Sequence, residues 1–163
     1  MEKIGIGALV RYRVIKRRVG EQKPYAVDDS EHNCFLVEGM NEMWNLILGI
    51  GGTAYNSANA RIGVGNGNAA ENESQTGLQG TSKYWKGMAT GYPKGPADAG
   101  DKKAVFRSVF ANGEAEFAWE EVTVVNASDD TGKNMLRIVQ SKGTKPSGEE
   151  WTAEIECTFQ NPT

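Results

Sequence analysis

Trp151-Thr-Ala-Glu-Ile-Glu-Cys-Thr-Phe159, near the carboxyl end of the chain, decides the fold. Apolar side chains occupy every second position of this stretch, and Thr or Glu fill the positions between them. Because successive side chains of a β-strand point to opposite faces, this alternation predicts a strand with one buried and one wet face. Such strands are typical of an antiparallel sheet that packs one face on a core.

Six further segments carry strand patterns, at residues 8–19, 60–65, 83–89, 103–110, 115–126 and 134–141. We expect the fourth and fifth to pair as a hairpin around Asn112-Gly113, with a bulge where the apolar parity changes after Trp119. Residues 20–31 contain Pro24 and an acidic run, and they are expected to form a polar connection.

Residues 37–48 are the one segment with a helical period. Their apolar side chains recur at i, i+3, i+4, i+7 and i+8, which predicts an amphipathic helix packed on the sheets, and Gly49 supplies a stop. The apolar positions are Met40, Met43, Trp44, Ile47 and Leu48. The sequence therefore predicts a mainly β fold, an antiparallel β-sandwich or small barrel of about seven strands with one packed amphipathic helix.

The length of the chain predicts a single β-rich domain over residues 1–163. The charge distribution predicts a basic amino-terminal arm at residues 1–23. The arm holds seven Lys or Arg against two Glu, a balance of +5, so the remainder carries −8 of the net charge of −3. We expect the arm to contact an acidic neighbouring subunit, or else to form a solvated strand face. A recognisable nucleic-acid module is missing, so no sequence-specific nucleic acid is expected. The candidate contacts are Arg11, Arg13, Lys16, Arg17 and Arg18.

Residues 51–80 are poor in chemistry, because seventeen of the thirty are Gly, Asn or Ala and three are charged. We interpret them as ordered architecture in which backbone passes close to backbone. The glycines Gly63, Gly65 and Gly67 are expected to shape a surface loop with a tight turn at Asn66-Gly67. A phosphate-binding loop is disfavoured, since no amphipathic helix and no Lys-Ser/Thr pair follow.

Other reactive residues do not form a catalytic constellation in the sequence. His32 and Cys34 are best explained as a surface histidine beside a half-buried thiol, and Cys157 as a buried free thiol. Adjacent carboxylates are expected to be solvated, because neighbours on a strand point to opposite faces. They lie at 28–29, 120–121, 129–130 and 149–150. We expect no enzyme activity, metal or cofactor, and neither a secretory signal nor a membrane span is recognisable.

Several segments, in this order, resemble a family of small tailed-bacteriophage virion structural proteins. The resemblance covers about residues 36–159 and leaves the basic arm outside. Its pieces are EGMNEMWNLI at 38–47, GTAYN at 52–56, NARIGVG at 59–65, QTGLQG at 75–80, KGMATGYP at 86–93, FAWE at 117–120 and KGTK at 142–145.

The resemblance implies a structural role in the virion without catalysis. For a compact 17.7 kDa chain it favours a capsid decoration (cement) protein that is made in the host cytoplasm and clamps neighbouring subunits on the capsid surface. Its partners would be the major capsid protein and copies of itself, as a trimer. A tail or tail-fibre component is the alternative.

A carbohydrate-binding module is a second alternative, which comes from the aromatic residues. Tyr84, Trp85 and Tyr92 would form a platform on which sugar rings stack. The competing interpretation places these aromatic side chains in the core.

Overall fold

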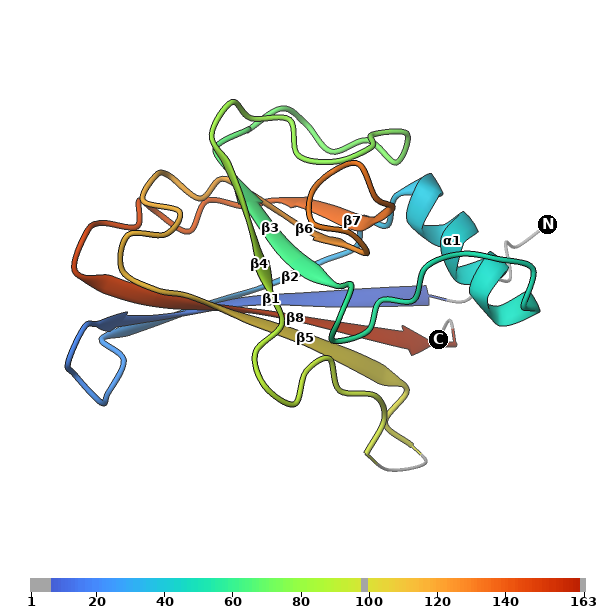
Figure 1. Cartoon of the computed structure of the whole chain (residues 1–163), viewed down its shortest axis with the longest axis horizontal. Helices are drawn as coiled ribbons and strands as arrows, with labels where there is room; N and C mark the ends of the chain where they lie inside the picture. Colours follow the sequence, from blue (N-terminus) through green and yellow to red (C-terminus); the bar gives the residue numbers. More distant parts are fainter. Residues whose placement is uncertain (1–6, 98–99, 162–163) are drawn as a thin grey trace.

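In the computed structural model, which describes residues 7–97 and 100–161, eight strands and one helix form two four-stranded antiparallel sheets (Figure 1). Sheet A has the order β2-β1-β8-β5 and sheet B the order β4-β3-β6-β7. The antiparallel β-sandwich is thus confirmed, whereas the barrel alternative is wrong because each sheet ends in outer strands. The strands are β1 (Gly7–Arg18), β2 (Ala26–His32), β3 (Arg61–Gly65), β4 (Lys83–Gly87), β5 (Lys103–Phe110), β6 (Glu121–Val125), β7 (Asn134–Val139) and β8 (Glu149–Gln160).

The first and last strands are neighbours over their whole length. β1 pairs with β8 from Gly7 opposite Gln160 to Arg18 opposite Glu149. Both strands alternate, so their inward residues meet in the core and their outward arginines and glutamates face one another. β1 therefore lies in the middle of sheet A, between β2 and β8, and the basic segment is an integral strand from Gly7 onward.

The polar connection predicted at residues 20–31 is wrong over its second half, where β2 runs antiparallel to β1. Its register places Asp29 opposite Arg13 and Glu31 opposite Arg11. Asp and Glu disfavour strands on their own, so the sequence pattern missed this element. Cross-strand pairing of opposite charges stabilises it instead.

The predicted hairpin around Asn112-Gly113 is also wrong. β5 pairs with β8 in sheet A, whereas β6 pairs with β3 and β7 in sheet B, so residues 111–120 carry the chain between the sheets. Trp119 is fully buried in this crossing and its indole N–H donates to the Ala115 carbonyl at 2.9 Å. The register shift lies between Val124 and Val125, not after Trp119.

The core lies between the sheets and is dominated by aromatic side chains. Trp119 packs edge-on against Phe110 and Trp151, with ring centroids 4.8 and 5.0 Å apart. Each such pair contributes about 0.5–1.5 kcal/mol beyond its buried area. Cys157 lies in the same core as a free thiol, as predicted.

Helix α1 (Val37–Leu48) has the predicted bounds and ends at Gly49, whose φ of 65° suits glycine. It lies at one end of the sandwich, beside the start of β1 and the end of β8 (Figure 1). The packing face, however, differs from the prediction. Gly39 and Glu42 are the buried residues of α1, while Trp44 and Ile47 are exposed.

Candidate interaction surface

The inward face of α1 is polar and held by hydrogen bonds. The Glu42 carboxylate accepts from the Thr53 backbone N–H at 2.6 Å and from the Asn126 amide at 3.0 Å. Glu38 accepts from the backbone N–H of Asn134 at 2.7 Å. Carboxylate acceptors of this kind satisfy buried donors, so they anchor the helix in one rotation about its axis.

Gly39 explains how this polar face comes so close to sheet B. A Cβ atom at this position would lie 2.4 Å from the Met135 Cα atom of β7. Only glycine admits that approach, and it lets the carboxylates of Glu38 and Glu42 reach backbone donors. The helix therefore packs through Gly39, its two glutamates and Met43, which contacts the core. The rest of its apolar stripe faces outward, at Trp44, Ile47 and Leu48.

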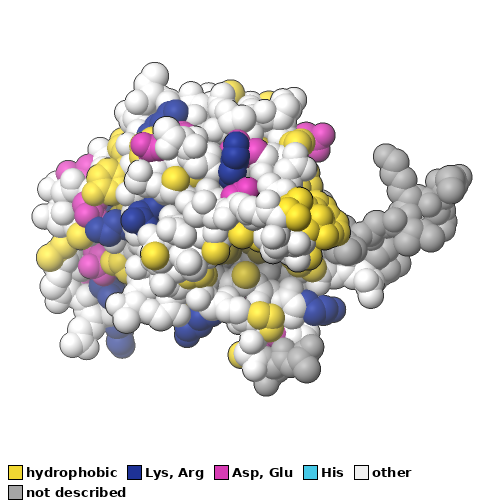
Figure 2. Space-filling view, turned by 45° about the vertical axis from the view of Figure 1, so that its right-hand side comes forward, with side chains coloured by type: hydrophobic (Ala, Val, Ile, Leu, Met, Phe, Trp, Pro, Cys, Tyr) yellow, Lys and Arg dark blue, Asp and Glu magenta, His cyan; other side chains and the backbone are white. Residues whose placement is uncertain are grey.

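The outward stripe of α1 is an exposed hydrophobic surface. Trp44 is 60% exposed and Ile47 is 73% exposed, and Ile50 extends the surface beyond the helix. Figure 2 shows hydrophobic side chains gathered on this side of the molecule. We call this surface the apolar end, and it consists of Val37, Met40, Met43, Trp44, Ile47, Leu48, Ile50 and Phe159.

The apolar end contains a groove of about 560 Å³ between α1 and the strands beside it. Met40, Met43, Trp44 and Ile47 form its helical wall. The opposite wall comes from strand ends and the segment before the helix, with Gly7, Ala8, Asn33, Phe35 and Phe159. A surface hollow lined almost entirely by apolar side chains is typical of a contact site.

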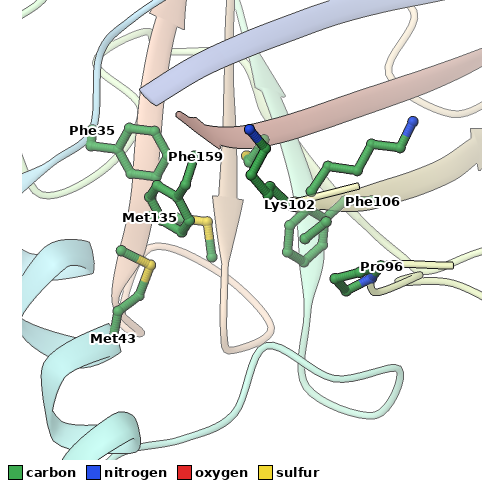
Figure 3. Close-up of a pocket in the computed structure, with 10 residues that line it drawn as sticks. Phe35, Met43, Pro96, Lys102, Phe106, Met135 and Phe159 are labelled. Carbon is green, nitrogen blue, oxygen red and sulfur yellow. The ribbon is translucent and has the colours of Figure 1, made fainter. Parts of the chain in front are cut away.

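A second hollow of about 250 Å³ continues the groove inward between the two sheets. Phe35, Met43 and Phe159 line both hollows, and Figure 3 shows Met43 directed toward Met135 and the two phenylalanines. Phe106 lies on the far wall (Figure 3). The apolar end is therefore continuous with the core.

The segment that follows the inward-facing Glu38 and Glu42 of α1 lacks charged residues. No Asp, Glu, Lys or Arg occurs from Met43 to Ala60, although charged residues make up 24% of the chain. Depletion of charge together with exposed aromatic and Met side chains is the compositional signature of an interface core. The sequence contained this signal, but the helical stripe alone could not say which side of α1 faces the sheets.

Four of the five predicted basic contacts have carboxylate partners within the chain. Arg11 binds Asp29 through contacts of 2.5–2.9 Å, and hydrogen bonds from Arg11 lower the pKa of that carboxyl. Arg13 lies 3.4 Å from both Asp29 and Glu154. The remaining pairs are Arg17 with Glu150 at 3.7 Å and Arg18 with Glu21 at 3.8 Å.

Lys16 differs from Arg11, Arg13 and Arg17 because its position in the alternation directs it toward the other face of β1. Its ammonium lies 4.4 Å from the centre of the Trp151 ring and donates to the Lys142 carbonyl. The structure thus presents the basic segment as a mixed-charge sheet face and not as a bare cationic arm. Contact of these residues with a neighbouring subunit stays a prediction.

Of the three glycines expected in a surface loop, only Gly67 lies in one, where a Cβ would come 2.4 Å from the Gly80 backbone N, and the predicted tight turn is not formed there. Gly63 and Gly65 are buried in β3, and Gly67 lies just beyond the strand without the positive φ that a tight turn would require. A Cβ on Gly63 would lie 2.6 Å from the Trp85 ring, and one on Gly65 would lie 2.5 Å from Glu121 Oε1. The glycines thus make room for side chains that cover the outer face of sheet B.

Glu121 shows why this face is covered. Its buried carboxylate accepts from the backbone N–H groups of Gly67, Gln79 and Gly80 at 2.7–3.1 Å, and from Arg137 Nε at 2.7 Å. The prediction of a solvated carboxylate at this position is wrong. The Gly- and Asn-rich residues 66–80 are ordered architecture, as predicted, because buried carboxylates bind their backbone donors.

The predicted stacking platform does not assemble. Tyr84 packs edge-on against Phe110 of the core, with ring centroids 6.1 Å apart, while the adjacent Trp85 covers Gly63 on the outer face. Tyr92 lies elsewhere, with the guanidinium of Arg107 4.8 Å from its ring centre. The three aromatic side chains therefore serve three different contacts.

The two cysteines are not activated. Burial is the largest cause that raises the pKa of the Cys34 thiol, and it raises the pKa of Cys157 to about 12. A thiolate is the reactive form, so both thiols are weak nucleophiles at neutral pH. Within residues 7–97 and 100–161, no group of three or more His, Cys, Asp or Glu could hold a metal ion. The helix in the same residues is too short to cross a membrane.

Comparisons with known proteins found no relative of this chain. No family model, no curated protein and no solved structure matches the chain.

Proposed function

We propose that this chain is a non-enzymatic structural protein of a bacteriophage virion, a capsid decoration protein that stabilises the shell through contacts between subunits. The observation that carries the proposal is the apolar end, an exposed hydrophobic surface that α1 presents to solvent. Exposed apolar surface costs solubility unless another molecule covers it. The resemblance of residues 36–159 to virion structural proteins is the reason for proposing a virion as the assembly that covers this surface.

The rigidity of the sandwich supports a structural role. β1 and β8 pair over twelve positions and join the two ends of the described chain in one sheet. The surface loops over sheet B are fastened by buried carboxylates such as Glu121. A subunit that is repeated over a shell benefits from such preorganisation, because it loses little conformational entropy when it binds.

The test is to mix the purified protein with expanded capsids that lack it and to image them by cryo-electron microscopy. We expect ordered density at threefold or quasi-threefold positions of the shell. Ile50→Glu should reduce the occupancy, because it places a charge in the apolar end. Val19→Glu is the matched control, since Val19 is also exposed but lies at the far end of β1. A bare shell with label on the tail would replace decoration by the tail alternative.

The role of the basic residues has to be tested by replacing their side chains and not by truncating the chain. Removing residues 1–18 would delete β1, which is a central strand of sheet A. Arg17→Glu with Arg18→Glu keeps the strand and reverses two charges at its end. Weaker shell binding by this variant would support the predicted contact with an acidic neighbour, and unchanged binding would contradict it.

A further inference from the structure

We propose that the side chains of Lys142 and Asp28 join in an amide bond, which the folded chain forms by itself with loss of one water. The inference goes beyond the proposed function and does not depend on it. Asp28 lies on β2 at the edge of sheet A, and Lys142 lies between β7 and β8. The bond would therefore cross-link two segments that are more than a hundred residues apart in the chain.

The structure holds the two reacting groups in direct contact. Lys142 Nζ donates to Asp28 Oδ1 at 2.7 Å, and the Lys142 side chain is fully inaccessible. The Lys142 backbone is fixed as well, because its N–H donates to the Trp119 carbonyl and its carbonyl accepts from Lys16 Nζ. Groups held together in a productive orientation react as if at an effective concentration of about 10⁵–10⁸ M, so condensation can compete with hydrolysis.

Formation of the amide also removes charge from the interior. The Lys142 ammonium lies 4.6 Å from the centre of the Tyr12 ring and has further contacts with β2. An ion that is withdrawn from water loses its hydration, and pairing with a counter-ion restores only part of that free energy. Condensation replaces both ions by a neutral group, so the folded environment favours the product.

The other lysine–carboxylate pairs of the described residues provide a contrast. Lys86 lies 2.6 Å from Glu114, which is as close as the Lys142 pair, but the Lys86 side chain is 34% exposed. Lys83 and Lys103 are also partly exposed, and their carboxylate contacts are longer, at 3.4–3.7 Å. Water around an exposed ammonium solvates the ion and competes for the carboxyl group. Of these pairs, only that of Lys142 combines close contact with an inaccessible amine.

A path for the protons lies beside the Lys142 amine. Lys142 Nζ lies 3.0 Å from Ser30 Oγ, and Ser30 Oγ lies 2.8 Å from His32 Nε2. Burial is the largest cause that lowers the pKa of His32, so its imidazole is neutral at neutral pH. With the ring hydrogen on Nδ1, His32 Nε2 accepts a proton through the Ser30 hydroxyl.

The reaction balances without an oxidant or a further reactant. One proton moves from Lys142 Nζ to Asp28 Oδ1, which gives a neutral amine and a neutral carboxylic acid. The amine lone pair then forms the bond to Asp28 Cγ, while Ser30 and His32 take up a second proton and return it to the leaving hydroxyl group. The Cγ–O bond breaks and water leaves. Because the Asp28 side chain is 39% exposed, this water can reach solvent.

The experiment measures the intact mass of the denatured whole chain and then maps its tryptic peptides. We expect the natural chain to weigh one water less than its sequence, with residues 28 and 142 in joined peptides and no cleavage after Lys142. Lys142→Arg keeps a cation but lacks the primary amine, so its mass should equal that of its sequence. Lys86→Arg is the matched control and should still lose water.

Two further variants separate the bond from the fold. Asp28→Ala removes the carboxyl group from an edge strand and should also keep its full mass, and circular dichroism checks that each variant is folded. His32→Ala should retain the full mass at first and lose water on the order of 100-fold more slowly during incubation. Loss of water at the natural rate in His32→Ala would overturn the proton path through Ser30 and His32.

Two results would overturn the proposed bond. A folded natural chain that keeps the full mass of its sequence after incubation at neutral pH would show that Lys142 and Asp28 remain an ion pair. Loss of water that persists in folded Lys142→Arg would place the dehydration at another residue. Since no shell is present in this experiment, its failure is separate from a failure of capsid binding.

Discussion

The outer face of sheet B buries charged side chains, whereas the apolar end exposes hydrophobic ones. The first buries an ion pair, Glu121 with Arg137, both with fully inaccessible side chains at 2.7 Å. The second exposes Trp44 and Ile47. The difference teaches that residue type alone does not decide burial: charge is buried where backbone donors and a counter-charge lie within the chain, and hydrophobic residues stay outside where the packing face is already occupied.

Removing Arg137 should break the first region most severely. Arg137→Met leaves the Glu121 carboxylate buried without its cation, and it also removes donors to Ala69 and Gln75. We expect a loss of about 3–5 kcal/mol in the free energy of unfolding, measured with urea. A loss below about 1 kcal/mol would mean that water reaches the carboxylate.

Gly39→Ala tests the contact that decides which way the helix faces. Alanine favours helices, yet its Cβ would lie 2.4 Å from Met135 Cα, and backbone cannot yield cheaply. We expect a loss of about 1–3 kcal/mol from overpacking, by urea titration. Asn41→Ala is the control on the exposed side of α1, where helix propensity alone should stabilise slightly. A stabilising Gly39→Ala would contradict the close approach.

The buried thiol of Cys157 makes stability depend on alkaline pH. Burial raises its pKa from 9.0 to about 12, so the folded state binds the proton more tightly than the unfolded state. Stability from this group is complete well below pH 9 and falls as the pH rises toward 12, by on the order of 1 kcal/mol at pH 10. The check is the difference in unfolding free energy between the natural chain and Cys157→Ala at pH 8 and pH 10. Equal slopes would contradict the burial of the thiol.

An ion pair on the outer face of sheet A should matter less than the pair beneath the sheet B loops. Arg107 binds Glu154 at 2.5–2.8 Å, but its side chain is 35% exposed and Arg13 remains beside the same carboxylate. We expect Arg107→Met to cost about 1 kcal/mol or less by urea titration. A cost as large as that of Arg137→Met would remove the contrast between the two faces.

Substitution in the apolar end should leave the folded monomer almost unchanged. Ile47 is 73% exposed, so Ile47→Ala should change the free energy of unfolding by less than about 0.5 kcal/mol. Ile138→Ala is the matched control in the core, where the side chain is inaccessible and the loss should be about 2–5 kcal/mol. A large effect at Ile47 would mean that α1 depends on its outward stripe for folding.

Much of the fold followed from local patterns, and the errors have physical causes. The alternation in β8 and the period and glycine stop of α1 predicted both elements, because side-chain direction follows backbone geometry. β2 was missed since its strand is stabilised by charge pairs with Arg11 and Arg13 across a register that no local pattern contains. The hairpin at Asn112-Gly113 was wrong because a turn signal does not specify which sheet receives the next strand.

By itself, the sequence determined the alternating strand β8, the helix bounds, the buried thiol at Cys157 and the lack of charge from Met43 to Ala60. These depend on side-chain period and composition over short spans. Only the tertiary structure decided that β1 is a central strand, that Glu121 is buried and that α1 turns Trp44 and Ile47 outward. The physical reason is that each of these depends on partners distant in the chain, such as Met135 against Gly39, whose approach is set when the sheets pack.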